Sequence, residues 1–203
     1  MEEKNEPVSI IDKPIDSQIE KKSSSFWELV RFILLALAIV VPIRMFVAQP
    51  FIVSGHSMDP SFNDSQYLIV DEISYHVGDP SRYDVIVFRP PLDESRFYIK
   101  RVIGLPGETV TTDGEKVTIK NAIHPDGFTL YEPYVKKHSN DQLKSYVLGE
   151  KEYFMMGDNR GASSDSRVWG LLPRKNIIGR ALVRILPIAD AGFFPGKFTP
   201  SEK

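Results

Sequence analysis

The chain has 203 residues, 42% of them hydrophobic, and a formal net charge of −2 at neutral pH. This length suits one domain of ordinary size with an appendage, and the apolar share is close to that of globular proteins. The small net charge gives no reason to expect a nucleic-acid partner. The absence of cysteine excludes a disulfide framework, thiolate catalysis and cysteine-based zinc or iron–sulfur sites.

Residues 1–25 are polar, carry charges of both signs and end in KKSSS, which predicts a flexible tail. The next segment, residues 26–48, is the most apolar part of the chain and predicts a single transmembrane helix. Its last twenty residues contain only two charged side chains, Arg31 and Arg44. Both lie near the ends of the segment, where long side chains reach the membrane interface.

A cleaved signal peptide is the alternative for this segment, because its uncharged core, residues 32–43, spans only twelve residues. A buried helix would also fit that length. However, the preceding tail is long and partly acidic, and FVAQP (46–50) is a poor small-x-small cleavage site. We therefore expect a retained membrane span.

The distribution of Lys and Arg predicts the orientation of this span. Basic residues lie before the span or at its start, namely Lys13, Lys21, Lys22 and Arg31. After Arg44 the next Lys or Arg is Arg82. The positive-inside rule then places the N-terminus in the cytoplasm and the working domain outside, as in a single-pass protein of the plasma membrane.

Residues 49–190 are expected to form this extracytoplasmic domain, followed by a C-terminal tail over residues 191–203. Short runs rich in Val, Ile, Tyr and Phe alternate with turns that contain Pro and Gly, and no useful helical pattern follows residue 52. This pattern predicts a mainly β fold, with an antiparallel sheet or a barrel-like domain. The expected strands are QYLIVDEI (66–73), YDVIVFRP (83–90), RFYIKRVIG (96–104), EKVTIKN (115–121) and NIIGRALVRILP (176–187).

The segment SGHSMDPSF (54–62) combines Gly, Ser, Met and Pro in a way that suits neither a helix nor a strand. Its Ser57 is a candidate nucleophile, although a serine in a turn is more often only a turn residue. A nucleophilic serine needs a base within hydrogen-bond reach. His56 is poorly placed because adjacent side chains diverge, and the other histidines lack a partner motif. A Ser-His-Asp triad therefore stays open but has no support.

Lys100, in FYIKRVIG, is the second candidate base. On a strand, Tyr98, Lys100 and Val102 would share one face, and Arg101 would lie on the other. A surface strand whose Lys and Arg reach solvent fits the same pattern. If the lysine is buried instead, desolvation lowers its pKa from about 10.4 by several units, and the neutral amine could accept the proton of Ser57. Arg101 cannot substitute, because a guanidinium stays protonated.

A third segment, MGDNRGASSDSRVWG (156–170), predicts a structured loop between strands. A solvated polar loop is the alternative for such a composition. The segment offers candidates for ion pairs and several hydroxyl groups, namely Asp158, Arg160, Asp165 and Arg167 together with Ser163, Ser164 and Ser166.

Taken in order, these segments resemble the type I signal peptidases, the bacterial leader peptidases that use a Ser–Lys dyad. The resemblance runs from the apolar segment to about Pro187. Several matching segments in the right order are more specific than any one of them. The resemblance is carried by QPFIVSGHSMDPSF (49–62), YDVIVF (83–88), YIKRVIGLPGE (98–108), EPYV (132–135), EYFMMGDNRGASSDSRVWG (152–170) and IIGRA (177–181).

This resemblance implies a membrane-anchored serine endopeptidase that cleaves signal peptides from exported precursor proteins after a small-x-small motif. It matches Ser57 to the nucleophile, Lys100 to the general base and Ser163 to a hydroxyl that orients the lysine amine. Asp165 and Arg167 match a charged pair that holds the loop against the site. Met58 matches a residue that packs beside the nucleophile, and we count it among the substrate-binding candidates. Positions near the substrate-binding groove are matched by Phe51, Val53, Phe62, Tyr98 and Ile99. We expect signal-peptide-bearing preproteins and the lipid bilayer as partners, and no cofactor, metal or nucleic acid.

Gly55 marks a departure from part of the family. Some members place a serine two residues before the nucleophile, where its hydroxyl helps to form the oxyanion hole, and here Ser54 lies one place too early. The Ser57 backbone N–H and another main-chain donor would then form the hole, and one such donor is worth about 3 kcal/mol. The short stretch between YDVIVF and MGDNR also predicts a compact catalytic domain without a large accessory β-domain.

Two alternatives to this assignment remain. Self-cleaving repressor-type proteases share a Ser–Lys dyad and a similar β-fold, but they usually carry a DNA-binding domain, and the tail has no room for a helix-turn-helix. A non-catalytic, membrane-tethered peptide-binding scaffold would tolerate loss of Ser57 or Lys100, and both are present.

Overall fold

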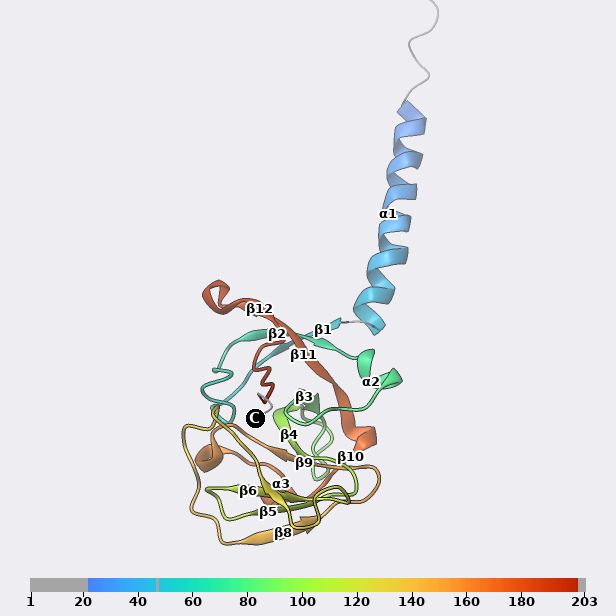
Figure 1. Cartoon of the computed structure of the whole chain (residues 1–203). Helices are drawn as coiled ribbons and strands as arrows, with labels where there is room; N and C mark the ends of the chain where they lie inside the picture. The colour runs from blue at the N-terminus through green and yellow to red at the C-terminus, as the bar shows by residue number, and fades with distance from the viewer. Residues whose placement is uncertain (1–21, 47, 201–203) are drawn as a thin grey trace, which may run out of the picture. The chain divides into compact units, whose positions relative to one another are not determined.

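The computed structural model describes residues 22–46 and 48–200, which belong to two compact units, Met1–Val41 and Pro42–Lys203. Within these residues the fold is mainly β, as the sequence predicts (Figure 1). The strands are β1 (Ala48–Ile52), β2 (Tyr67–Asp71), β3 (Val85–Phe88), β4 (Tyr98–Gly104), β5 (Thr109–Thr112), β6 (Val117–Lys120), β7 (Phe128–Thr129), β8 (Lys144–Val147), β9 (Glu152–Met156), β10 (Leu172–Pro173), β11 (Ile177–Leu186) and β12 (Gly192–Phe193). The helices are α1 (Lys22–Phe46), α2 (Ser74–Val77) and α3 (Ser166–Trp169), with 3₁₀ turns η1 (Arg160–Ala162), η2 (Arg174–Asn176) and η3 (Ile188–Asp190).

Helix α1 contains most of the apolar segment that the sequence predicts to span a membrane. Between residues 26 and 40 most of its side chains are apolar and exposed. No helix within the described ranges combines the length and the apolar character that crossing a bilayer requires. The transmembrane helix over 26–48 therefore stays a prediction. Residues 1–21 of the predicted tail, and residue 47, lie outside the described residues.

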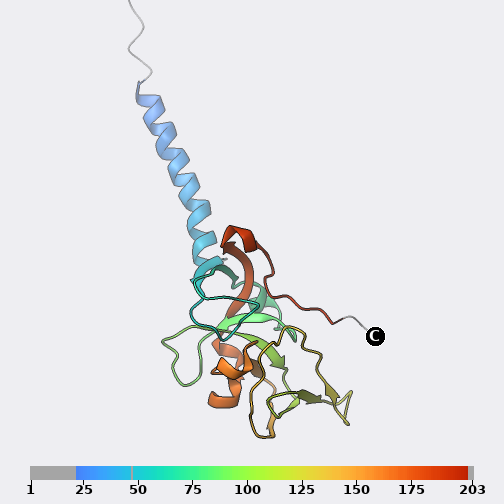
Figure 2. The ribbon, with the colours of Figure 1, turned by 90° about the vertical axis from the view of Figure 1, so that its left-hand side faces the viewer.

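The strands form two antiparallel sheets. The larger sheet has eight strands in the order β1-β2-β11-β3-β4-β9-β10, with β12 added beside β11. The smaller sheet has the order β7-β6-β5-β8. Both views place the smaller sheet at the opposite end of this unit from β1, β2 and β12 (Figures 1 and 2). The antiparallel architecture predicted from the sequence is thus confirmed, and the smaller sheet is built from the short stretch between β4 and β9.

Strand β4 lies in the middle of the larger sheet and carries the two neighbouring basic residues, Lys100 and Arg101. Only 5% of Lys100 and none of Arg101 is exposed, which excludes the surface strand that the sequence left open. Strand β3 pairs with β4 along its first four residues, whereas β9 pairs with β4 only from Arg101 onward. Among the described residues, Tyr98, Ile99 and Lys100 therefore have one backbone edge without a partner strand.

A buried apolar cluster supports the segment that contains Ser57. We call residues 54–62 the nucleophile segment. Two of its side chains, Met58 and Phe62, are almost fully buried, because they insert between β2, β3 and β11. We call this group the Met58 cluster, and its buried members are Val53, Met58, Phe62, Leu68, Val85 and Ala181.

The C-terminal segment differs from the tail that the sequence predicts from residue 191. Strand β12 pairs with β11, and the backbone N–H of Phe194 donates to the carbonyl of Leu182 at 2.7 Å. Further on, the ring of Phe198 packs edge-on against Tyr83, with 5.0 Å between centroids. Residues 192–198 are thus packed against the domain. Their Gly, Phe and Pro residues show no strand or helix period, so the sequence pattern did not reveal these contacts.

A fully buried ion pair joins β4 to the loop after β9. Arg101 donates from Nε and Nη2 to the two carboxylate oxygens of Asp158, at 2.8 and 2.6 Å, and neither side chain is exposed. The third nitrogen, Nη1, donates to the carbonyl of Tyr83 at 2.9 Å. Because each charge is paired and hydrogen-bonded, the guanidinium is tolerated in the interior.

We predict that Asp158→Ala lowers the free energy of unfolding by about 3–5 kcal/mol, because it leaves the Arg101 charge buried and unpaired. The matched control is Asp79→Ala, which removes a carboxylate that is 80% exposed and pairs with Arg174. That control should cost less than about 1 kcal/mol. Urea denaturation followed by tryptophan fluorescence measures both. Equal losses for the two variants would contradict the expected difference.

Candidate active site

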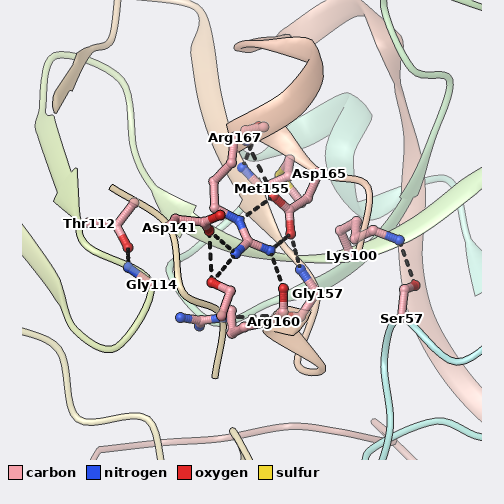
Figure 3. A network of polar contacts seen from close by, with 12 residues as sticks. Ser57, Lys100, Thr112, Gly114, Asp141, Met155, Gly157, Arg160, Asp165 and Arg167 are labelled. Carbon is pink, nitrogen blue, oxygen red and sulfur yellow. Dashed lines mark hydrogen bonds and ion pairs between the residues drawn. The ribbon is translucent and has the colours of Figure 1, made fainter. Parts of the chain in front are cut away.

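The nucleophile segment brings Ser57 to the free edge of β4. The Nζ atom of Lys100 lies 2.7 Å from the Oγ atom of Ser57 (Figure 3). It also donates to the carbonyl of Ile99 at 3.0 Å. The two side chains are 43 residues apart in the sequence. The structure therefore brings together the serine and the lysine that the sequence singled out.

Burial makes this lysine unusual. It lowers the pKa of the Lys100 amine from its ordinary value of 10.5 to about 8, although the carboxylates of Asp165 and Asp158 act in the opposite direction. The charged form is disfavoured because the amine has lost most of its water. A substantial fraction of Lys100 is consequently neutral near pH 8 and available to accept a proton.

The loop after β9 fixes the backbone of the nucleophile segment. The backbone N–H of Asn159 donates to the carbonyl of Ser57 at 3.1 Å, and its side-chain amide donates to the carbonyl of His56 at 3.0 Å. The loop and the nucleophile segment are in close contact at Gly157. A Cβ atom added there would lie 2.3 Å from both the Ser57 carbonyl oxygen and Ser163 Oγ. Only glycine allows this approach.

Asp165 and Arg167 form the charged pair that the resemblance implies. The guanidinium of Arg167 donates to both oxygens of Asp165 at 2.8 and 2.7 Å, and Asp165 is fully buried (Figure 3). The same carboxylate accepts from the backbone N–H of Gly157 at 3.1 Å. Arg167 also donates to Asp141 at 2.6 Å and to the carbonyl of Arg160 at 2.8 Å. These contacts hold the loop around Asp165 in one conformation.

The other two charged residues of this loop find partners elsewhere in the chain. Asp158 pairs with Arg101 of β4, as described above, and Arg160 pairs with Glu132 at 2.6 Å. Both pairs are buried, so the loop is not the solvated polar loop that the sequence left as an alternative. Long-range partners of this kind carry no spacing signal in the sequence.

Ser163 is not hydrogen-bonded to the lysine. Its Oγ atom is buried and has no hydrogen-bond partner among the described residues. It lies against Gly157, on the inner side of the loop that also carries Asp165. The orienting hydrogen bond to Lys100 that the resemblance implies is therefore absent from this geometry.

A groove of about 560 Å³ opens beside the Ser57–Lys100 pair. It lies between the β1 end of the larger sheet and the free edge of β4, and four of the predicted substrate-binding residues line it. Apolar side chains form most of its wall, with Ser54, Ser164 and Arg96 as polar members. The lining residues include the predicted Phe51, Val53, Tyr98 and Ile99, together with Ser57, Lys100, Leu68, Val87 and Phe97.

Two predicted groove residues are placed differently. Met58 is 1% exposed and Phe62 is fully buried, and neither lines the groove. Both side chains belong to the Met58 cluster, so they anchor the nucleophile segment in the core. The apolar character of these positions could not distinguish a groove wall from the core beneath it.

Gly55 adopts a conformation that favours glycine, with φ at +89°. Its backbone N–H donates to Asp64 at 2.7 Å. This hydrogen bond is the main reason why the pKa of the Asp64 carboxyl lies below its ordinary value. The Gly55 amide is therefore engaged, and we expect no contribution from it to an oxyanion hole.

The histidine alternative receives no support. The ring of His56 points to solvent, with 71% of its side chain exposed, and its Nδ1 atom lies 3.1 Å from Asp59. Among the described residues, Lys100 is the one side chain that hydrogen-bonds to Ser57 Oγ. The described part of the chain also contains no group of three His, Asp or Glu side chains that could hold a metal ion.

Sequence reasoning missed three contributors to the site. Arg101 was considered only as a failed base, whereas it binds Asp158 behind Lys100. Asn159 and Gly157, which fix the nucleophile segment, were treated as loop residues. Their position in GDN, between a buried strand and the Ser-rich stretch, was the available signal.

Comparison with known proteins agrees with this site. A family model described as "Signal peptidase, peptidase S26" matches residues 26–186. A protein from Synechocystis sp. named "Probable signal peptidase I-1" is 36% identical, over 85% of this chain and 90% of its own length. A "Signal peptidase I" from Leptolyngbya laminosa is 39% identical, over 89% of each chain.

Two further matches are each 30% identical to this chain. A "Signal peptidase I" from Bacillus amyloliquefaciens is 30% identical, over 94% of this chain and 97% of its own length. The crystal structure of a signal peptidase I from Enterococcus faecalis V583 is 30% identical, over 51% of this chain and 97% of that chain, with a TM-score of 0.43. The family match over most of the chain, and relatives of this identity, establish that the chain belongs to the signal peptidase family, peptidase S26.

Proposed function

We propose that this signal peptidase removes signal peptides from exported preproteins with Ser57 as nucleophile and Lys100 as general base. The observation that carries the assignment is the 2.7 Å contact between Lys100 Nζ and Ser57 Oγ at the floor of an open groove. Burial of the amine supports the same roles, because a general base works best with a pKa near the working pH.

The reaction follows acyl-transfer chemistry. The hydroxyl of Ser57 donates its proton to the neutral Lys100 amine while Oγ attacks the carbonyl carbon of the scissile bond. The ammonium then protonates the leaving amine, so the peptide bond breaks and an ester to Ser57 remains. A water molecule next gives its proton to Lys100 and attacks the ester, which releases the carboxylate and restores the hydroxyl. We assign the Ser57 backbone N–H as one oxyanion donor, because the Gly55 amide is bound to Asp64.

The substrate is expected to bind as an extended strand. Tyr98, Ile99 and Lys100 have a free backbone edge, and β1 bounds the other side of the groove. An added strand would gain main-chain hydrogen bonds there, while its alternate side chains would face the groove wall. The family resemblance implies small residues at the first and third positions before the cut, and we propose that their side chains face the mostly apolar wall of this groove.

We predict that Ser57→Ala and Lys100→Ala each lower kcat by at least about a thousandfold, because each removes one half of the proton-transfer pair. Lys100→Arg should fail as well, since a guanidinium does not lose its proton. The readout is cleavage of an exported preprotein in detergent, with N-terminal sequencing of the product and circular dichroism to verify folding.

The control for this experiment is His56→Ala, which should retain most of the activity. An inactive His56→Ala beside an active Lys100→Ala would favour a histidine base. Cleavage that persists in Ser57→Ala would remove the serine mechanism altogether. A folded wild-type protein that binds preproteins without cleaving them would instead favour the peptide-binding scaffold.

We predict that kcat/KM rises with pH through an acidic limb near pH 8. Lys100 must be neutral to accept a proton, and it is protonated below its lowered pKa of about 8. Arg167→Ala should move this limb to higher pH, because it uncovers the Asp165 carboxylate, which raises the pKa of the amine. Arg174→Ala, which removes a cation paired with distant Asp79, should leave the limb in place.

The measurement is a pH–rate profile of the three proteins on one peptide substrate. A wild-type limb near 10 would contradict the buried neutral lysine. A limb that moves downward in Arg167→Ala would contradict the electrostatic role of the Asp165–Arg167 pair.

We propose that α1 anchors the enzyme in the plasma membrane, with the N-terminus in the cytoplasm and the catalytic domain outside. The exposed apolar side chains of α1 between residues 26 and 40 support an apolar environment for this helix. The excess of Lys and Arg before the helix supports the orientation. This placement would bring the enzyme to the membrane face where exported preproteins emerge.

Protease added outside intact spheroplasts is therefore expected to digest the domain after residue 48 and to spare an N-terminal epitope tag. The result is read with antibodies against the tag and against the C-terminus. Opening the spheroplasts with detergent supplies the control, because both regions then become accessible. A protected C-terminal domain in intact spheroplasts would reverse the proposed orientation.

A further inference from the structure

We propose that residues 192–198, which we call the C-terminal strap, position the Ser57–Lys100 pair for the reaction. The strap follows the part of the chain that matches the family model, which ends at residue 186. In Figure 1 it is the red trace that runs from β12 back across the domain. This inference rests on the dyad assigned above and adds a positioning element to it.

The strap contacts the residue next to the proposed base. The carbonyl of Gly196 accepts a hydrogen bond from Arg101 Nη1 at 2.7 Å. Arg101 has no exposed surface, so this carbonyl is one of the groups that compensate its buried charge. The same guanidinium binds Asp158 of the active-site loop and approaches Ser61 of the nucleophile segment at 3.4 Å. The strap, the loop and the nucleophile segment therefore meet at one side chain.

The strap also closes the cluster beneath the nucleophile. Gly196 has φ at +72°, and a Cβ atom there would lie 2.6 Å from Cε2 of Phe62 and 3.4 Å from Cγ2 of Val85. Phe62 is in turn connected to the start of its segment, because its backbone N–H donates to the carbonyl of Met58 at 2.9 Å. Met58 directly follows Ser57. Movement of the strap would thus remove a packing contact of the Phe62 ring, which supports the nucleophile segment.

Both ends of the strap are anchored to the domain. At one end the guanidinium of Arg180 lies 4.8 Å from the ring centroid of Phe194. At the other end, Phe198 packs against Tyr83 and Tyr134, with centroids 5.0 and 5.5 Å apart. The packing of Phe198 therefore helps to keep the Gly196 carbonyl within hydrogen-bond distance of Arg101. Phe198 itself touches no reacting atom.

Loss of the strap should affect rate and pH dependence together. A displacement of about 1 Å between a nucleophile and its base lowers a rate by roughly a hundredfold. Water admitted beside Arg101 would weaken its hold on Asp158, and that carboxylate raises the pKa of Lys100. The second carboxylate near the amine, Asp165, is held by Arg167 and does not contact the strap.

The test compares two full-length variants and one shortened chain with the wild type in detergent. Phe198→Ala removes the anchor, Phe198→Tyr keeps an aromatic ring, and a chain that ends at Pro200 controls for the loss of the last residues. We expect Phe198→Ala to lower kcat by roughly ten- to a hundredfold with KM within about twofold, and to move the acidic limb upward. Phe198→Tyr and the chain ending at Pro200 should behave like the wild type.

A stability control separates positioning from simple unfolding. Ile177→Ala removes a buried side chain of β11 that lies in a different apolar cluster from the strap. All proteins are assayed at least about ten degrees below their measured unfolding temperatures. If Phe198→Ala keeps a wild-type kcat and limb, or only matches Ile177→Ala, the strap has no positioning role. If it does not fold, Gly196→Ala, which displaces the strap from Phe62, is measured by the same criteria.

Failure of the strap proposal is distinguishable from failure of the dyad. A wild-type profile in Phe198→Ala, together with an inactive Ser57→Ala, would leave the dyad intact and remove only the strap. An active Ser57→Ala would remove the dyad, and the strap proposal with it.

Discussion

Two adjacent cations on one buried strand impose the constraint on which the site depends. Arg101 has no exposed surface and keeps its charge, because Asp158 binds it through two hydrogen bonds. Lys100 is almost as deeply buried, yet no carboxylate of the described residues pairs with it, and its pKa falls to about 8. The same interior thus stabilises the charge of Arg101 and lowers the pKa of its neighbour Lys100. A carboxylate beside Lys100 instead of Arg101 would raise the pKa of the lysine and leave the guanidinium buried without a partner.

The loop after β9 maintains this separation of charge. Its two buried carboxylates, Asp158 and Asp165, each lie within electrostatic reach of Lys100, and each is covered by an arginine. Gly157 lets the loop approach the Ser57 carbonyl, and Asn159 donates hydrogen bonds to the carbonyls of His56 and Ser57. Nucleophile geometry and lysine electrostatics are consequently controlled by one stretch of chain, so a change in either is expected to disturb the other.

The sequence predicted the mainly β fold and the two residues at the centre of the site, because strand periodicity and short motifs are local signals. It could not decide whether β4 was buried, since Lys and Arg on a strand fit a surface as well as a paired interior. It placed Met58 and Phe62 at the groove, although both lie in the core beneath it. It also missed the packing of the C-terminal segment. Each of these depends on partners far away in the chain, such as Gly196 for Arg101, and no local pattern encodes them.

The short free edge of β4 has a consequence for turnover. In the part of the chain that the structure describes, Tyr98, Ile99 and Lys100 have no partner strand on that side, because β9 pairs with β4 only from Arg101 onward. An edge of three residues offers few ladder hydrogen bonds, so a peptide bound as proposed would gain only part of its affinity from the main chain and the rest from its side chains in the groove. A long open edge would invite pairing with a second copy of the protein or slow the departure of cleaved peptide. Because β9 pairs with β4 from Arg101 onward, the proposed docking edge would be long enough to align a scissile bond and too short to hold the cleaved peptide tightly.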